Sequence, residues 1–374
     1  MVSAAVIYAV YGMGWVSVAP NRLLPGQAIS ALGVLGPATH LVALVSVLPA
    51  ALVFWPPRRA VAGLCVACLV AGILAALCTT GWATPELLSG RPSSARVMFG
   101  AGFWVALGGL FLLLIEQLSR SENRRVAGIA AAILVGGVAL SLSAGWFDQL
   151  SLAVEARARS EALWTAFLQH VLLSALAVLL ALVIAVPLGW WAFRSFRARS
   201  GVDAALSAIQ VTPALALFGL LIPLLSAALG ALPWLRDWGF SAVGPTPALI
   251  GVAIYMSLPL VRGIVSGLGA ADPAVVDAAR ALGMTESRLA LEIRLPLGLP
   301  VLLSALRVAL MQGIGLMTLG GLIGAGGLGS VVFEGMSQFA PDLILIGALP
   351  VVMLAVLTDW AFSSLSKLVE GRVR

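Results

Sequence analysis

Long apolar runs separated by short polar segments constrain this sequence more than any other feature. Of its 374 residues, 61% are hydrophobic and only 10% are charged, and the mean hydropathy is +1.06. A soluble domain of this length does not need so much apolar surface, so the solvent for most of the chain must be a lipid bilayer. We therefore predict an all-α integral membrane protein.

A helix needs about 20 apolar residues to cross a bilayer. With that length as the criterion, the sequence predicts about ten spans. The first is the least regular, because it is short and interrupted by glycine. The predicted spans are Val2–Ala19, Gly33–Trp55, Ala60–Trp82, Val97–Leu118, Val126–Trp146, Val171–Phe193, Ala205–Leu229, Ala248–Gly267, Gly298–Leu322 and Leu343–Leu365.

The net charge of +6 could suggest a nucleic-acid partner, but its distribution argues against one, because the arginines stand in short clusters between apolar runs. If the N-terminus is cytoplasmic and the spans alternate, most Arg and Lys residues fall on the cytoplasmic side, as the positive-inside rule requires. We expect both termini in the cytoplasm. The residues that fall on the opposite side are Arg22, Arg91, Arg96, Arg157, Arg159 and Arg236.

The segment from Asp272 to Pro296 is the most polar long stretch in the C-terminal half. Asp272 can cap a helix that starts with Pro273, and Gly283 can end that helix in a left-handed conformation. Thr285 can cap a second helix, which we expect Pro296 to close. The orientation above places this helical hairpin in the cytoplasm.

The same segment resembles the EAA loop of ABC importer permeases. The match consists of Asp277-Ala278-Ala279, then Gly283, then Ile293-Arg294-Leu295-Pro296, with both spacings of the family pattern and with Asp277 where the family has Glu. The resemblance implies that Asp277, Ala278, Ala279, Gly283, Ile293, Leu295 and Pro296 form the loop that docks into a cytoplasmic ATPase. An ordinary amphipathic hairpin is the alternative.

Further segments resemble the permeases for quaternary amines. Gln210-Val211-Thr212-Pro213 is similar to their Gln-Thr-Ile-Pro segment, and Ile323–Gly329 is similar to their glycine-rich turn, which methionine permeases share. Weaker matches are Ser257-Leu258-Pro259 with Arg262, where the chain lacks the Asn-Thr that often follows, and Leu349-Pro350 with Asp359. Extra N-terminal spans resemble one branch of the osmoprotectant permeases.

These matches imply a division of the chain. Residues 1–146 form an N-terminal five-span region, and residues 147–170 form a partly helical connector. Residues 171–368 form a type I ABC importer permease core of five spans that contains the loop 272–296, and residues 369–374 form a cytoplasmic tail.

Polar residues inside the predicted spans are candidates for a substrate pathway. Hydrogen bonding between helices is the alternative explanation for each of them. The candidates are Gln210, Thr212, Pro213, Tyr255, Ser257 and Gln312.

Several chemistries find no support in the sequence. His40 and His170 are far apart, and the three cysteines make one C-x-x-C without a second pair, so we predict no metal site. A phosphate-binding loop needs Gly-Lys-Ser/Thr, and the only lysine is Lys367, so ATP would be hydrolysed by another subunit. The run Gly324, Gly326, Gly327 and Gly329 fits G-x-G-x-x-G, but an apolar helical run precedes it. We therefore predict a glycine-rich turn and no nucleotide site.

The resemblance implies a permease subunit, not an enzyme, in the inner membrane of a bacterium. It implies a second permease subunit, an ATPase and an extracytoplasmic substrate-binding protein as partners, and glycine betaine, choline or carnitine as substrate. A methionine-type importer is the main alternative. An ion-coupled secondary transporter is a weaker one, because the first half holds no twin of the loop.

Overall fold

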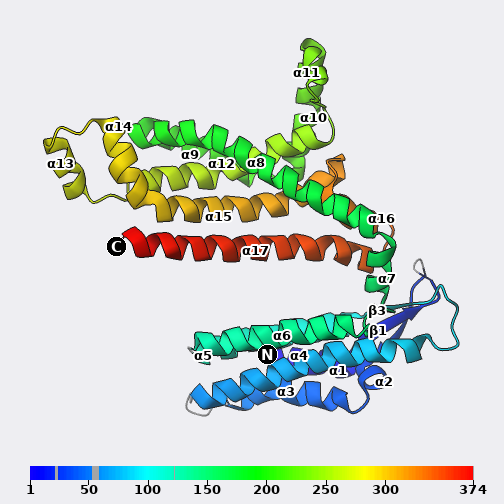
Figure 1. Ribbon diagram of the computed structural model, residues 1–374. Coiled ribbons are helices and arrows are strands. Elements are labelled where there is room, and N and C mark those ends of the chain that lie inside the picture. The colour runs from blue at the N-terminus through cyan, green and yellow to red at the C-terminus, as the bar shows by residue number, and fades with distance from the viewer. Residues whose placement is uncertain (22–23, 53–58, 122, 374) are drawn as a thin grey trace. The chain divides into compact units, whose positions relative to one another are not determined.

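The computed structural model describes residues 1–21, 24–52, 59–121 and 123–373. The chain forms two compact units, Met1–Ala158 and Arg159–Arg374 (Figure 1). Their boundary falls inside the segment 147–170, where the sequence changes character. The two units are described separately below.

The N-terminal unit consists of helices around a small sheet. Strands β1 (Gly14–Ala19), β2 (Gln27–Ser30) and β3 (Arg96–Phe99) form an antiparallel sheet in the order β2-β1-β3. The helices are α1 (Val2–Gly12), α2 (Ala31–Leu35), α3 (Ala38–Leu52), α4 (Arg59–Leu88), α5 (Ala101–Ser121), α6 (Arg124–Ser143) and α7 (Ser151–Ala158).

The sheet corrects the first predicted span. Helix α1 ends at Gly12 after 11 residues, and Gly14–Ala19 is a strand instead of the second half of a membrane helix. Trp15 and Val16 are buried there, and the indole Nε1–H of Trp15 donates to Thr80 Oγ1 at 2.9 Å. Aromatic and β-branched residues favour strands, but a short apolar run has no period that separates a strand from a helix.

Two other predicted spans of this unit also begin differently. The predicted span Gly33–Trp55 is interrupted at Gly36, where φ is +54°, and its last residue, Trp55, lies outside the described residues. The predicted span Val97–Leu118 starts as strand β3 and becomes helical only at Ala101.

The C-terminal unit is a helical bundle with α12 at its centre. Helices α8 (Ser160–Arg194), α12 (Pro245–Leu268), α15 (Leu295–Gly320) and α17 (Pro341–Val373) run side by side (Figure 1). The most apolar 18-residue window of α12 is 67% buried, against 33% or less for the other candidate spans of this unit. The remaining helices are α9 (Phe196–Val211), α10 (Ala214–Ala231), α11 (Trp234–Asp237), α13 (Pro273–Ala281), α14 (Glu286–Arg288) and α16 (Gly327–Ser337).

Within the described residues, eight helices are long and apolar enough to cross a membrane, and two shorter apolar helices cover Val2–Gly12 and Ala38–Pro49. The predicted span Ala205–Leu229 is divided, because α9 ends at Val211 and α10 begins at Ala214. Pro213 stands at this break, and its ring both removes a backbone donor and disfavours a helical conformation of the residue before it.

Candidate functional site

The loop after α12 begins with the caps that the sequence predicts. Asp272 Oδ1 accepts a hydrogen bond from the backbone N–H of Ala274 at 2.8 Å, and Pro273 is the first residue of α13. After the helix ends, Gly283 has a φ of +83°, and the N–H of Met284 donates back to Ala279 O at 3.1 Å. This geometry is a glycine-dependent helix ending. The turn therefore depends on position 283 having no Cβ.

The second half of the loop differs from the prediction at its end. Thr285 caps α14 through the N–H of Arg288, but Pro296 does not close the helix. Instead, α14 continues through a π-helical turn, Leu289–Arg294, directly into α15. Pro296 falls in the first turn of α15, where proline is tolerated, and a π-turn is a frequent way to widen a helix locally. The result is one helix from Glu286 to Ile323.

Apolar contacts and ion pairs hold the two halves of the loop together. Val276 and Ala279 of α13 pack with buried Leu289, and Ile293 lies against the same cluster. Across the turn, Arg280 Nε lies 2.8 Å from Glu286 Oε1. This hydrogen bond is the main cause that raises the pKa of Arg280 above its ordinary value.

The opposite face of the loop is exposed and carries small and apolar residues. Asp277 and Ala278 are exposed, and Leu282 and Leu291 are 84% and 65% exposed. An exposed leucine on a short, well-capped helix offers apolar area without further ordering of the chain. Such a face is suited to contact another protein.

Three of the predicted pathway residues meet at the break between α9 and α10. Gln210 Nε2–H donates to the backbone carbonyl of Tyr255 at 2.8 Å, and the Tyr255 hydroxyl donates to the carbonyl of Thr212. Tyr255 is buried, whereas Thr212 and Pro213 are exposed. The break is thus fastened to the central helix α12 by two side chains.

The other two pathway candidates lie on neighbouring turns. Ser257 is fully buried and donates to Ala253 O of its own helix at 2.8 Å, which favours a structural role. Gln312 is half-buried on α15. Its neighbour Gly313 faces Met256, where a Cβ would lie 2.7 Å from the sulfur, so Gln312 is level with Tyr255 along α12.

The glycine-rich turn is tightly packed. Gly324, Gly326 and Gly327 have φ values of +81°, +83° and +70°, and a Cβ at Gly329 would clash with the backbone carbonyl of Thr318. Gln169 of α8 binds this turn with both ends of its amide: Nε2–H donates to Ala325 O at 3.2 Å, and Oε1 accepts from Gly327 N at 3.0 Å. A helix precedes the motif, not the strand that a dinucleotide site requires.

Several polar contacts were not predicted from the sequence. Gln169 is one, and the adjacent His170 donates from Nε2 to Ile314 O at 3.1 Å. Arg307, which lies near the end of a predicted span, pairs with Asp359 of α17 at 2.6 Å. A polar residue in an apolar run signals each of them, but their partners lie too far along the chain for spacing to identify.

Comparison with known proteins decides the class. The family described as "Binding-protein-dependent transport system inner membrane component" matches residues 177–374, more than half of the chain. The protein belongs to this family. Residues 1–153 match a second family, "ABC transporter permease YehY, N-terminal domain".

Relatives of this ABC importer permease match its C-terminal half. The "Carnitine transport permease protein OpuCB" of Listeria monocytogenes is 34% identical over 197 residues, which cover 53% of this chain and 83% of that protein. The "Osmoprotectant import permease protein OsmW" of Salmonella typhimurium is 36% identical over 192 residues, which cover 51% of this chain and 84% of that protein. Residues 1–153 account for the extra N-terminal region.

A solved structure shares the fold of this permease. The chain titled "Inward facing conformations of the MetNI methionine ABC transporter: CY5 native crystal form" matches with a TM-score of 0.50 and 20% sequence identity, over 56% of this chain and 97% of that chain. At this identity the likeness shows the type I permease fold alone. The protein is therefore a multi-pass membrane permease component of an ABC importer, as the sequence predicts.

Proposed function

We propose that this permease moves a small quaternary amine, such as glycine betaine, choline or carnitine, into the cell. The observation that supports this most directly is the set of similar proteins. OpuCB of Listeria monocytogenes is titled a carnitine permease, and OpuBB of Bacillus subtilis, 30% identical over 195 residues, is titled a choline transport permease. A methionine importer remains the second candidate because the fold is shared.

The loop 272–296 is the contact for a cytoplasmic ATPase. Its exposed face, with Ala278 and Leu282, is the docking surface, and its buried face joins it to the helices that move. One helix runs from Glu286 through α15, and Gly298 at the start of α15 touches the backbone of Gly267 at the end of α12. A displacement of α13 is therefore transmitted to both α12 and α15.

The break at Thr212–Pro213 is part of the substrate pathway. A quaternary ammonium has no N–H to donate, so it is stabilised by carbonyl dipoles and aromatic faces. The C-terminal end of α9 carries partial negative charge, and the N-terminal end of α10 carries partial positive charge. A zwitterion such as glycine betaine can satisfy both ends, as substrates do at discontinuous membrane helices.

The remaining assignments follow from the family and the charge distribution. Two permease subunits, identical or related, form the pathway in the inner membrane of a bacterium, with both termini in the cytoplasm. A substrate-binding protein delivers the amine outside, and the ATPase subunits hydrolyse ATP, so this chain needs no cofactor of its own.

Reconstitution of the permease with its ATPase and binding protein tests the substrate. We expect ATP-dependent uptake of radiolabelled glycine betaine, choline or carnitine, and no competition from a tenfold excess of methionine. Uptake of methionine without uptake of any quaternary amine would show that the second candidate is right.

A further inference from the structure

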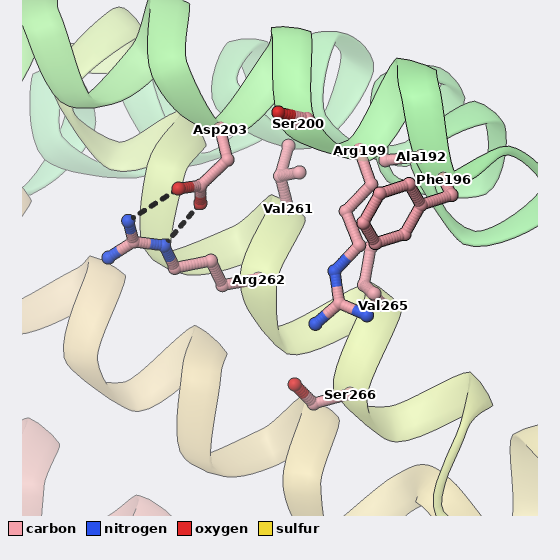
Figure 2. A pocket seen from close by; sticks show the side chains of 9 residues that line it. All are labelled: Ala192, Phe196, Arg199, Ser200, Asp203, Val261, Arg262, Val265 and Ser266. Carbon is pink, nitrogen blue, oxygen red and sulfur yellow. Dashed lines mark hydrogen bonds and ion pairs between the residues drawn. The ribbon is translucent and has the colours of Figure 1, made fainter.

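A hollow of about 430 Å³ lies between α9 and the last turns of α12, with the end of α8 beside it (Figure 2). Its polar lining comes from two arginines, Arg199 and Arg262, one carboxylate, Asp203, and two serines, Ser200 and Ser266. It lies at the same end of the C-terminal unit as the loop 272–296, because α12 leads directly into that loop.

The two arginines of the hollow are in different states. Arg262 Nε and Nη2 donate to the two carboxylate oxygens of Asp203 at 2.6 and 3.0 Å, and Nη2 also donates to Ser207 Oγ at 3.0 Å. Arg199 makes no hydrogen bond or ion pair with the residues that the structure describes, and Figure 2 shows its guanidinium directed toward Ser266. With Arg262 and Asp203 neutralising each other, the hollow carries one uncompensated positive charge.

The rest of the hollow is apolar. Ala192, Val261 and Val265 are buried side chains that line it, and Phe196 at its rim is 85% exposed. The hydroxyls of Ser200 and Ser266 are exposed and make no hydrogen bond with any described residue. A free guanidinium, two free hydroxyls and an apolar wall together suit an anion that carries alkyl chains.

The surroundings place this hollow at a membrane surface. The preceding turn of α8 holds Trp190 and Trp191, aromatic residues of the kind that gather at bilayer interfaces, and the α8–α9 corner adds the exposed arginines Arg194 and Arg197. Basic clusters beside a cytoplasmic helix end attract anionic lipids.

We propose that this hollow binds the headgroup phosphate of an anionic phospholipid from the cytoplasmic leaflet. Arg199 supplies the charge, Ser200 and Ser266 donate to phosphate oxygens, and Val265 and Phe196 contact the first part of an acyl chain. The Asp203–Arg262 pair fixes the floor of the hollow. The choice of leaflet rests on the orientation proposed above, but binding itself does not.

Retention of lipid by the purified permease tests this proposal without any transport measurement. The protein is incorporated into nanodiscs that contain phosphatidylglycerol and phosphatidylcholine with the same chains, and then released and analysed by native mass spectrometry. We expect retained phosphatidylglycerol, and about a tenfold or greater loss of its affinity in Arg199→Gln, since a hydrogen-bonded ion pair is removed. Arg197→Gln is the matched control, because it removes the same charge from α9 outside the hollow.

Each other outcome overturns the proposal. Equal retention in both variants would mean that the charged corner attracts lipid without a site. Displacement of phosphatidylglycerol by millimolar inorganic phosphate would identify a free-phosphate site instead. Disulfide formation between two permease copies through Ser200→Cys would show that a second subunit covers the hollow. Because lipid retention is measured without transport, its result is independent of the substrate assignment.

Discussion

The loop after α12 and the break between α9 and α10 hold their residues by different means. The loop is stabilised by neighbours in sequence: Asp272 caps two residues ahead, and Gly283 turns the chain between Arg280 and Glu286. The break is held from a distance, because Gln210 and Thr212 both depend on Tyr255 of another helix. The part proposed to meet the ATPase is locally built, whereas the part proposed to meet substrate depends on the packing of the whole unit.

The largest effect that separates the two regions is expected for Gly283→Val. At a φ of +83° a side chain costs about 1–2 kcal/mol, and more when it is β-branched, so α13 loses its orientation. We expect ATP-driven uptake and co-purification of the ATPase to fall at least about tenfold, while substrate exchange through the permease persists.

Two controls accompany this substitution. Gly283→Asn should retain most uptake, because asparagine tolerates the left-handed conformation. Gly128→Val in α6, where a Cβ meets open space, measures the cost of valine elsewhere. Normal uptake and normal ATPase binding in Gly283→Val would refute the role proposed for the loop.

A smaller and opposite effect is expected for Tyr255→Phe. It removes the buried hydroxyl that binds the Thr212 carbonyl, an interaction worth about 0.5–1.5 kcal/mol. We expect uptake to fall by up to about tenfold, with unchanged co-purification of the ATPase. Tyr8→Phe is the control, since Tyr8 is 67% exposed. If Tyr255→Phe releases the ATPase, the two regions are not separable.

The same contrast explains how much of this molecule could be predicted from the sequence. The caps at Asp272 and Thr285 and the turn at Gly283 are confirmed, because each depends on residues within a few positions. The continuation of α14 into α15 was missed, since Pro296 favours a helix end until a π-turn accommodates it. The strand Gly14–Ala19 was missed because its partners are β2 and β3, and β3 lies about 80 residues away in the sequence.

The binding of the glycine-rich turn by Gln169 shows the same limit. The sequence indicates a turn at Gly324–Gly329, and the positive φ values confirm it. Nothing in the spacing identifies Gln169, some 156 residues earlier, as the side chain that fits against it. The proposed roles of the loop and the pathway residues remain predictions that only the experiments above can decide.

A modest effect on the loop alone is expected for Arg280→Gln. The guanidinium pairs with Glu286 at 2.8 Å and with Asp277 at 3.4 Å, but all three side chains are exposed, so the pairs contribute only about 0.2–1 kcal/mol. Uptake should fall no more than about fivefold, and the loss should grow less distinct at high salt. Arg288→Gln is the control, because Arg288 pairs only with Glu292 on the next turn. A complete loss of uptake in Arg280→Gln would mean that Arg280 contacts the ATPase directly.

The smallest effect is expected from the link between the two regions, the ion pair of Asp203 and Arg262. The hydrogen bond from Arg262 lowers the pKa of the Asp203 carboxyl below its ordinary value of 3.8. A group with a lowered folded-state pKa contributes stability that is present above the unfolded pKa and is lost as the pH falls through the folded pKa. Thermal unfolding of the parent protein and of Asp203→Asn should therefore differ by the same small amount from pH 8 to pH 5, and the two should converge only below about pH 4. A difference that disappears between pH 8 and pH 5 would mean that another titrating group, not this ion pair, joins α9 to α12.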